Sequence, residues 1–154
     1  PGLAKLMGGK AKTSSKLNDL FLRAEKQGFT IGNSHDLEQH PEYNRIPINY
    51  GNQPSIQTAN IFNHLGRPWL TQYWSRKVVE TVYEGLSPER GYNGDEDQGL
   101  MGALAVLMKI GLFSVDGGCS VTPTLELGSP IFDNITLHLN PEFYDGLFQA
   151  PGML

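Results

Sequence analysis

The chain has 154 residues, of which 39% are hydrophobic and 10% aromatic, and it carries a formal net charge of −4. This length suits one domain, and the apolar content excludes intrinsic disorder. The negative net charge gives no indication of a basic surface for nucleic acid. No apolar run reaches the roughly 18 residues of a membrane span. The single cysteine, Cys119, excludes an internal disulfide and a cysteine-rich metal site.

The first part of the chain predicts a helix that ends at Gly28, with Ser14 or Ser15 as its N-cap. Its apolar residues recur at helical spacing: Leu17, Leu20, Phe21 and Ala24. Residues 31–50 are rich in Asn, His, Asp and Pro, which favours a long structured loop, and loops of that length in compact domains are commonly functional.

Two further helices are predicted after this loop. Pro54 suits the first turn of a helix that runs to about Leu65 and ends at Gly66. A second helix is expected over residues 69–84, with one inward face formed by Tyr73, Val78, Val79 and Val82.

Residues 85–94 predict a second irregular loop, after which Asp97 can cap a helix that closes at Gly111. The apolar face of that helix consists of Met101, Leu104, Ala105 and Met108. Beyond Gly117 the apolar period changes from 3.6 to 2, which predicts half-buried strands over residues 121–127 and 135–139, joined through residues 128–130. Two strands are marginal alone, so we expect them to pair with strands outside this chain.

The acidic stretch before the last helix has the residue types of a cation site. Asn93, Asp95 and Asp97 occupy alternate positions, as at the start of an EF-hand loop. The sixth and twelfth positions of such a loop would be Gln98 and Leu104 instead of glycine and glutamate, which excludes an EF-hand. Two interpretations stay open: oxygen ligands suited to calcium, or acids that favour the N-terminal dipole of a helix.

The second polar motif places the side-chain amides of Asn52 and Gln53 directly before Pro54. They are either cation or sugar ligands, or simply turn and N-cap residues. The histidines (His35, His40, His64 and His138) show no zinc spacing, and Ser55 has no nucleophile-elbow context. Aromatic side chains such as Trp69 and Trp74 could stack on sugar rings, although aromatics on helices usually pack in a core.

Several motifs together resemble family 92 of the glycoside hydrolases, the calcium-dependent exo-acting α-mannosidases. In chain order they are YGNQPS at 50–55, GDEDQG at 94–99, IGLFSV at 110–115, LGSPIF at 127–132 and ITLHL at 135–139. The resemblance covers nearly the whole chain. It implies a mainly α fold: residues 1–117 as a helical portion of an (α/α)6 barrel, and residues 118–154 as C-terminal β-strands of a sandwich-like element.

The resemblance also implies a site and a reaction. In the family, Asp95 and Asp97 match positions proposed to activate the attacking water of an inverting hydrolysis. Asn52, Gln53 and Asp97 match the calcium ligands, with Asn52 and Gln53 also facing substrate. The implied partners are α-mannoside glycans, in mannans or N-glycans and α-1,2-linked, without nucleic acid or membrane. The implied source is a bacterium that secretes the enzyme or holds it in the periplasm or at the cell surface.

Two departures from the family pattern bear on activity. Gln53 stands where many members have glutamate, which removes a charge beside the metal. The family's general-acid glutamate belongs to a segment N-terminal to the matched part, together with a β-sandwich domain. Because the chain opens Pro1-Gly2-Leu3 with neither methionine nor signal peptide, we expect a C-terminal piece of a longer hydrolase, inactive by itself. The alternatives are a non-catalytic helical module that binds carbohydrate or calcium, and an inert structural fragment.

Overall fold

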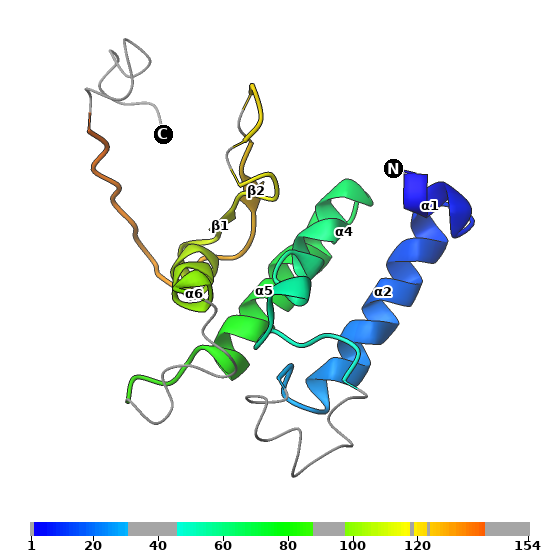
Figure 1. Ribbon diagram of the computed structural model, residues 1–154, viewed down its shortest axis with the longest axis horizontal. Coiled ribbons are helices and arrows are strands. Elements are labelled where there is room, and N and C mark those ends of the chain that lie inside the picture. The colour runs from blue at the N-terminus through cyan, green and yellow to red at the C-terminus, as the bar shows by residue number, and fades with distance from the viewer. Residues whose placement is uncertain (1, 31–45, 88–97, 118, 123, 141–154) are drawn as a thin grey trace.

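The computed structural model describes residues 2–30, 46–87, 98–117, 119–122 and 124–140, which form a mainly helical chain with one small sheet (Figure 1). The elements before the sheet are, in chain order, α1 (Gly2–Leu6), α2 (Lys10–Glu25), the 3-10 turns η2 (Gln53–Ser55) and η3 (Thr58–Asn60), α4 (Ile61–His64), α5 (Pro68–Val82) and α6 (Leu100–Ile110). Helix α5 lies between α2 and α6 (Figure 1). No helix of the described part of the chain is long and apolar enough to cross a bilayer.

Helix α2 begins earlier than its predicted cap. Its N-cap is Gly9 and its first residue is Lys10, so the prediction of an N-cap at Ser14 or Ser15 is wrong. The preceding glycine pair turns the chain, because Gly9 has a φ of 104° that other residues rarely adopt. Thr13 then donates its hydroxyl to the Gly9 carbonyl at 2.9 Å, inside the first turn.

The predicted helix over residues 54–65 is broken into shorter pieces. Pro54 lies in η2, the chain continues through η3, and only Ile61–His64 forms an α-turn before Gly66 at a φ of 75°. Hydrogen bonds to other parts of the molecule hold this stretch. Thr71 of α5 donates its hydroxyl to the Ala59 carbonyl at 2.9 Å, and the Ala59 N–H donates to the Tyr50 hydroxyl at 3.0 Å. These bonds replace the regular helical ladder.

Helix α5 begins at Pro68, as its missing N–H allows, and buries one face. The valines of the predicted inward face, Val78, Val79 and Val82, are all buried. Tyr73 is 49% exposed, so its placement on the inward face is wrong. The neighbouring Trp74 is buried instead: successive side chains point about 100° apart on a helix, and at this position the indole is the one that faces α2.

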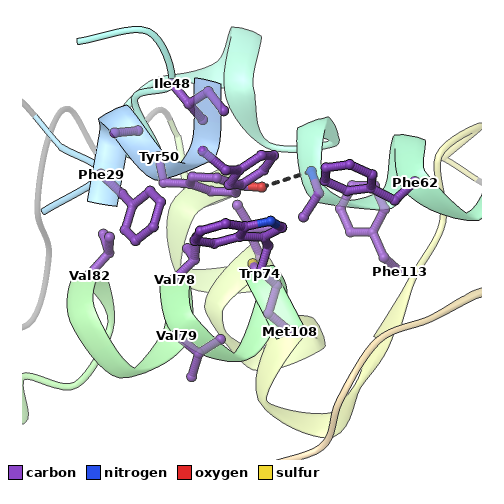
Figure 2. Packing of buried hydrophobic residues seen from close by; sticks show 14 of the residues in the cluster. Phe29, Ile48, Tyr50, Phe62, Trp74, Val78, Val79, Val82, Met108 and Phe113 are labelled. Atoms are coloured by element: carbon purple, nitrogen blue, oxygen red, sulfur yellow. Dashed lines mark hydrogen bonds between the residues drawn. The ribbon is translucent and has the colours of Figure 1, made fainter. Parts of the chain in front are cut away.

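The core is an aromatic cluster between α2, α5 and the 3-10 turns (Figure 2). The ring of Trp74 stacks on Phe21 of α2 with centroids 5.0 Å apart, and Phe29 meets the same indole edge-on at 6.0 Å. The ring centroids of Phe62 and Phe21 are 5.6 Å apart. Burial of each such ring contributes roughly 1.5–3 kcal/mol, so this cluster determines how α2 and α5 pack.

The sheet pairs different segments from those predicted. Strand β1 (Leu112–Phe113) runs antiparallel to β2 (Glu126–Leu127), with Leu112 opposite Leu127. Of the first predicted strand, over 121–127, only Glu126–Leu127 forms, and its partner lies within the chain and not outside it as expected. The second predicted strand is wrong, since 135–139 form no strand and their side chains are exposed. Arg76 of α5 explains the path after β2. Its Nε donates to the Ser129 hydroxyl at 3.1 Å and its Nη2 donates to the Pro130 carbonyl. These bonds hold the segment after β2 against α5.

Candidate functional site

Tyr50 and the turn after it form the best-defined part of the candidate site. The Asn49 side chain accepts the Gly51 N–H at 2.9 Å, and the Asn49 N–H donates to the Ser55 hydroxyl at 3.0 Å. The Ser55 N–H returns to the Asn52 carbonyl at 3.2 Å. Residues 49–55 therefore form a turn held by its own hydrogen bonds. The Ser55 hydroxyl accepts one of these bonds, and this structural role explains its presence without nucleophilic chemistry.

The turn presents its two amide side chains to the outside. Asn52 and Gln53 are both exposed. Asn52 is the N-cap residue of η2, but its side chain makes no capping hydrogen bond. Asn52 therefore has the N-cap position that was predicted as the alternative to a ligand role, but its side-chain amide does not cap the helix. Both amides project from a fixed backbone, which is what a ligand-binding turn requires.

Two buried tyrosines connect this turn to the helices. The Tyr50 N–H donates to the Phe29 carbonyl at 2.7 Å, and its hydroxyl accepts the Ala59 N–H, as the dashed line in Figure 2 shows. Tyr83 comes directly after α5 and donates its hydroxyl to the Tyr50 carbonyl at 2.6 Å. The same hydroxyl lies 3.9 Å from the Met101 sulfur, in the first turn of α6. One side chain therefore contacts both the turn and the start of α6.

Burial affects the ionisation of both tyrosines. Loss of solvation raises the pKa of the Tyr50 hydroxyl, and the neighbouring Tyr83 adds to the increase, while the hydrogen bond from Ala59 acts in the opposite direction. Burial alone raises the pKa of Tyr83. Both hydroxyls consequently stay protonated near neutral pH, and Tyr83 remains a hydrogen-bond donor to the turn.

The predicted acidic residues Asp95 and Asp97 lie outside the described residues. The structure describes the chain again from Gln98, which has a φ of 61°, and Gly99, at 88°, is the N-cap of α6. The helix thus begins at Leu100, later than a cap at Asp97 would require. The predicted apolar face of α6 is confirmed in Met101, Leu104 and Met108, which are buried.

Of the four histidines, His35 and His40 lie outside the described residues, and His64 has a structural partner. His64 Nε2 lies 2.9 Å from Glu126 Oε1, and the other oxygen of Glu126 accepts the Asn63 amide at 2.6 Å, which joins α4 to β2. Within the described ranges no group of three or more His, Cys, Asp or Glu side chains could hold a metal ion. Oxygen donors in the described part of the site are therefore the amides of Asn52 and Gln53, which suit a hard cation such as calcium and not zinc.

Comparison with known families identifies the chain. The family model of the glycosyl hydrolase family 92 catalytic domain matches residues 1–146. The chain belongs to this family. No curated protein matches the sequence of this family 92 chain. Membership makes the protein a glycoside hydrolase by family, and its mainly helical fold with a two-stranded sheet is consistent with the helical part expected for such a domain.

Sequence reasoning missed Tyr83 in this family 92 chain. Its position just after an amphipathic helix carries no local signal, since a tyrosine at a helix end is usually a packing residue. Its importance arises from the hydroxyl, which reaches a carbonyl 33 residues earlier in the chain. Only the folded arrangement reveals that contact.

Proposed function

We propose that this chain contributes the catalytic-base side and part of the calcium site of an inverting exo-α-mannosidase that removes terminal α-mannosyl residues. The proposal rests above all on the Tyr83 hydroxyl, which is 2.6 Å from the Tyr50 carbonyl and 3.9 Å from the Met101 sulfur. The same hydroxyl thus contacts the residue two before Asn52 and a residue in the first turn of α6. Asp97 is bonded directly to Gln98 at that end of the helix, which supports a shared site.

The donor chemistry fits calcium. Calcium accepts carboxylate and amide oxygens together and takes six to eight of them. Asn52 and Gln53 would supply amide oxygens from the turn, and Asp97 would supply a carboxylate. Bound calcium would hold two hydroxyls of the sugar and offer positive charge where the ring distorts. The remaining ligand positions would fall to water, to substrate and to other residues.

The chain's own residues would act on the attacking water and the sugar. Asp95 and Asp97 would orient a water on the face opposite the leaving group and accept its proton. An inverting enzyme separates this base from the acid by roughly 6.5–9.5 Å to leave room for that water. Asn52 and Gln53 would orient the sugar through its hydroxyls. The general acid would be the family's glutamate, from a segment N-terminal to the matched part.

The cellular context is part of the same proposal. Terminal α-mannosides occur in mannans and N-glycans, and a bacterium meets such glycans outside its cytoplasm. We therefore place the enzyme in the secreted, periplasmic or cell-surface fraction and propose α-mannoside glycans, α-1,2-linked, as its partners.

A second candidate is a helical module that binds carbohydrate without cleaving it. One observation favours it: Trp69 on α5 is 53% exposed, and the Arg67 guanidinium lies 5.2 Å from the centre of its ring. Tyr73, one turn further along α5, is also exposed. Exposed aromatic rings of this kind stack on sugars, and such a site would need neither Asp95 nor Asp97.

The test compares hydrolysis of α-1,2-mannobiose by the natural gene product, its Asp97→Asn variant and the 154-residue chain alone. We expect proton NMR to show β-mannose as the first product of the natural protein. We expect Asp97→Asn to lose at least about 100-fold in rate, as for removal of a general base. The chain alone should show no turnover. First release of α-mannose, or full activity of Asp97→Asn, would contradict the proposal, and glycan binding without turnover by the natural protein would favour the second candidate.

A further inference from the structure

The Tyr83 hydroxyl is in contact with two other segments of the chain. Tyr83 is 2% exposed and caps the C-terminal end of α5. Its hydroxyl donates to the Tyr50 carbonyl at 2.6 Å, and the Met101 sulfur of α6 lies 3.9 Å from the same oxygen. A single hydroxyl thus lies between the end of α5, the turn and the first turn of α6.

We propose that Tyr83 is a positioning residue that holds the Asn52–Gln53 turn in register with the start of α6. This inference rests on the proposed function, because the register matters only if the turn and the α6 end share one site. Tyr83 itself would touch neither metal nor sugar. Its effect would pass through the backbone of Tyr50, which is two residues before Asn52.

The other bonds of Tyr50 show why the Tyr83 contact has a separate effect. The Tyr50 N–H is bound to Phe29 and its hydroxyl to Ala59, so these bonds fix Tyr50 relative to the end of α2 and to η3. Neither bond reaches α6. The Tyr83 hydroxyl contacts both the Tyr50 carbonyl and α6. Its removal should therefore leave the core intact while the turn moves relative to α6. Binding sites lose affinity steeply when such a supporting contact is lost.

The nature of the contact also fits a positioning role across pH. Burial keeps the pKa of the Tyr83 hydroxyl above its ordinary value, so it donates to the turn throughout the neutral and mildly alkaline range. A side chain that changed protonation near neutral pH would move the turn with it.

The decisive variants are Tyr83→Phe and, as a matched control, Thr71→Val. Thr71 is fully buried on the same helix, and its hydroxyl also donates to a backbone carbonyl, that of Ala59, at 2.9 Å. Each variant removes one buried hydroxyl that donates to a backbone carbonyl, so both should lower the thermal midpoint to a similar degree. They differ in that Tyr83 reaches α6.

Calcium binding to the natural gene product, measured by calorimetry after chelation, gives the first readout. We expect Tyr83→Phe to raise the calcium dissociation constant about five- to tenfold, the effect of one lost hydrogen bond, and Thr71→Val to change it less than about twofold. Equal shifts in the two variants would show a general loss of packing and overturn the inference. An unchanged constant in Tyr83→Phe would overturn it as well.

Hydrogen exchange in the presence of chelator separates this inference from the proposed function. The Gly51, Asn52 and Ser55 amides are all hydrogen-bonded within the turn and report its order. We expect their exchange to accelerate about five- to tenfold in Tyr83→Phe and to stay near the natural rate in Thr71→Val. If the natural protein bound no calcium, the metal site would fail while this pattern would still support the positioning role. Unchanged exchange in Tyr83→Phe would refute that role whatever the metal result.

Discussion

The indole Nε1 of Trp74 donates a hydrogen bond of 2.8 Å to Oδ1 of Asn18, which joins α5 to α2 beside the aromatic cluster. Trp74 is 1% exposed, so its N–H has been taken out of water and requires a partner. Asn18 is half-buried and sits one turn before Phe21, on which the indole stacks. The Asn18 amide oxygen therefore satisfies the polar N–H of Trp74 in this core.

Replacement of Asn18 by alanine tests this pairing. Asn18→Ala should lower the free energy of unfolding by about 1–2 kcal/mol, because the indole N–H would be left buried without its acceptor. Urea unfolding followed by tryptophan fluorescence measures the change. Asp19→Ala, on the exposed face of the same helix, is the control and should stay within about 0.5 kcal/mol. Equal effects of the two substitutions would show that the hydrogen bond contributes nothing measurable.

The two buried tyrosines predict a loss of stability at alkaline pH. Their pKa values are raised in the folded chain, whereas in the unfolded chain tyrosine has its ordinary pKa of about 10. Above about pH 10 the unfolded chain therefore binds fewer protons than the folded one, and stability falls as pH rises towards the folded pKa values. The contribution is fully present below about pH 10. Unfolding free energies of the natural protein should accordingly decline progressively as the pH rises above about 10.

Single tyrosine variants identify the source of that decline. Each group contributes at most about 1.4 kcal/mol per pH unit, so Tyr83→Phe should remove about half of the slope. Tyr73→Phe alters a tyrosine that is 49% exposed and should leave the slope as it is. A decline that is equally steep in Tyr83→Phe would mean that other groups cause it.

Gly111, at the end of α6, should lose more stability on replacement by alanine than Gly117 does. Its φ is 78°, and a Cβ at this position would lie 2.7 Å from both Cδ and N of Pro130. Gly117 has a φ of 61° with nothing within 4 Å of the same atom. Both alanine substitutions incur the left-handed backbone cost of about 1–2 kcal/mol, but Gly111→Ala should lose about 1–3 kcal/mol more through overpacking. Thermal unfolding of the two variants side by side measures the difference, and equal losses would contradict the close approach.

The pair formed by Glu126 and His64 should be asymmetric in its effect on stability. The Glu126 side chain is 13% exposed and also accepts the Asn63 amide, whereas the His64 side chain is 60% exposed. Among the described residues Asn63 Oδ1 is buried without a hydrogen-bond partner, so loss of Glu126 would leave the whole amide unpaired. Glu126→Ala should cost about 1–3 kcal/mol and His64→Ala less than about 1 kcal/mol in urea unfolding. Equal costs would mean that the His64–Glu126 contact, which both variants lose, dominates, and a larger cost for His64→Ala would contradict the prediction.

The two aspartates of the proposed site should differ in their dependence on calcium. Asp97 is proposed to touch both metal and water, and Asp95 to act on the water alone. Asp97→Asn should therefore raise the calcium concentration needed for half-maximal binding as well as slow hydrolysis, while Asp95→Asn should slow hydrolysis with little change in metal affinity. Calcium titration of each variant after chelation gives the comparison, and superimposable curves would refute this division of roles.

Much of this fold could be predicted from the sequence because its signals are local. Apolar spacing predicted the three long helices, with buried positions such as Phe21, Val78 and Leu104. Glycine at the end of α6 was predicted as its stop, since Gly111 adopts a left-handed φ of 78°. The exposed amides at Asn52 and Gln53 also reflect a local pattern, two polar residues before a proline. The aspartates at 95 and 97 lie outside the described residues and stay predictions.

The features that the sequence could not determine depend on contacts between distant residues. Three such features each require a partner from another element. They are the burial of Trp74 in place of Tyr73, the break of the helix expected after Pro54, and the pairing of β2 with Leu112–Phe113. The link from Tyr83 to Tyr50 is of the same kind. The spacing of apolar residues in the sequence indicates which face of a segment is buried. It does not indicate which hydrogen bonds form between two segments, because these depend on how the segments pack. The sequence by itself therefore determined the three long helices and the family motifs, and the tertiary structure decided that the Tyr83 hydroxyl contacts both Tyr50 and Met101.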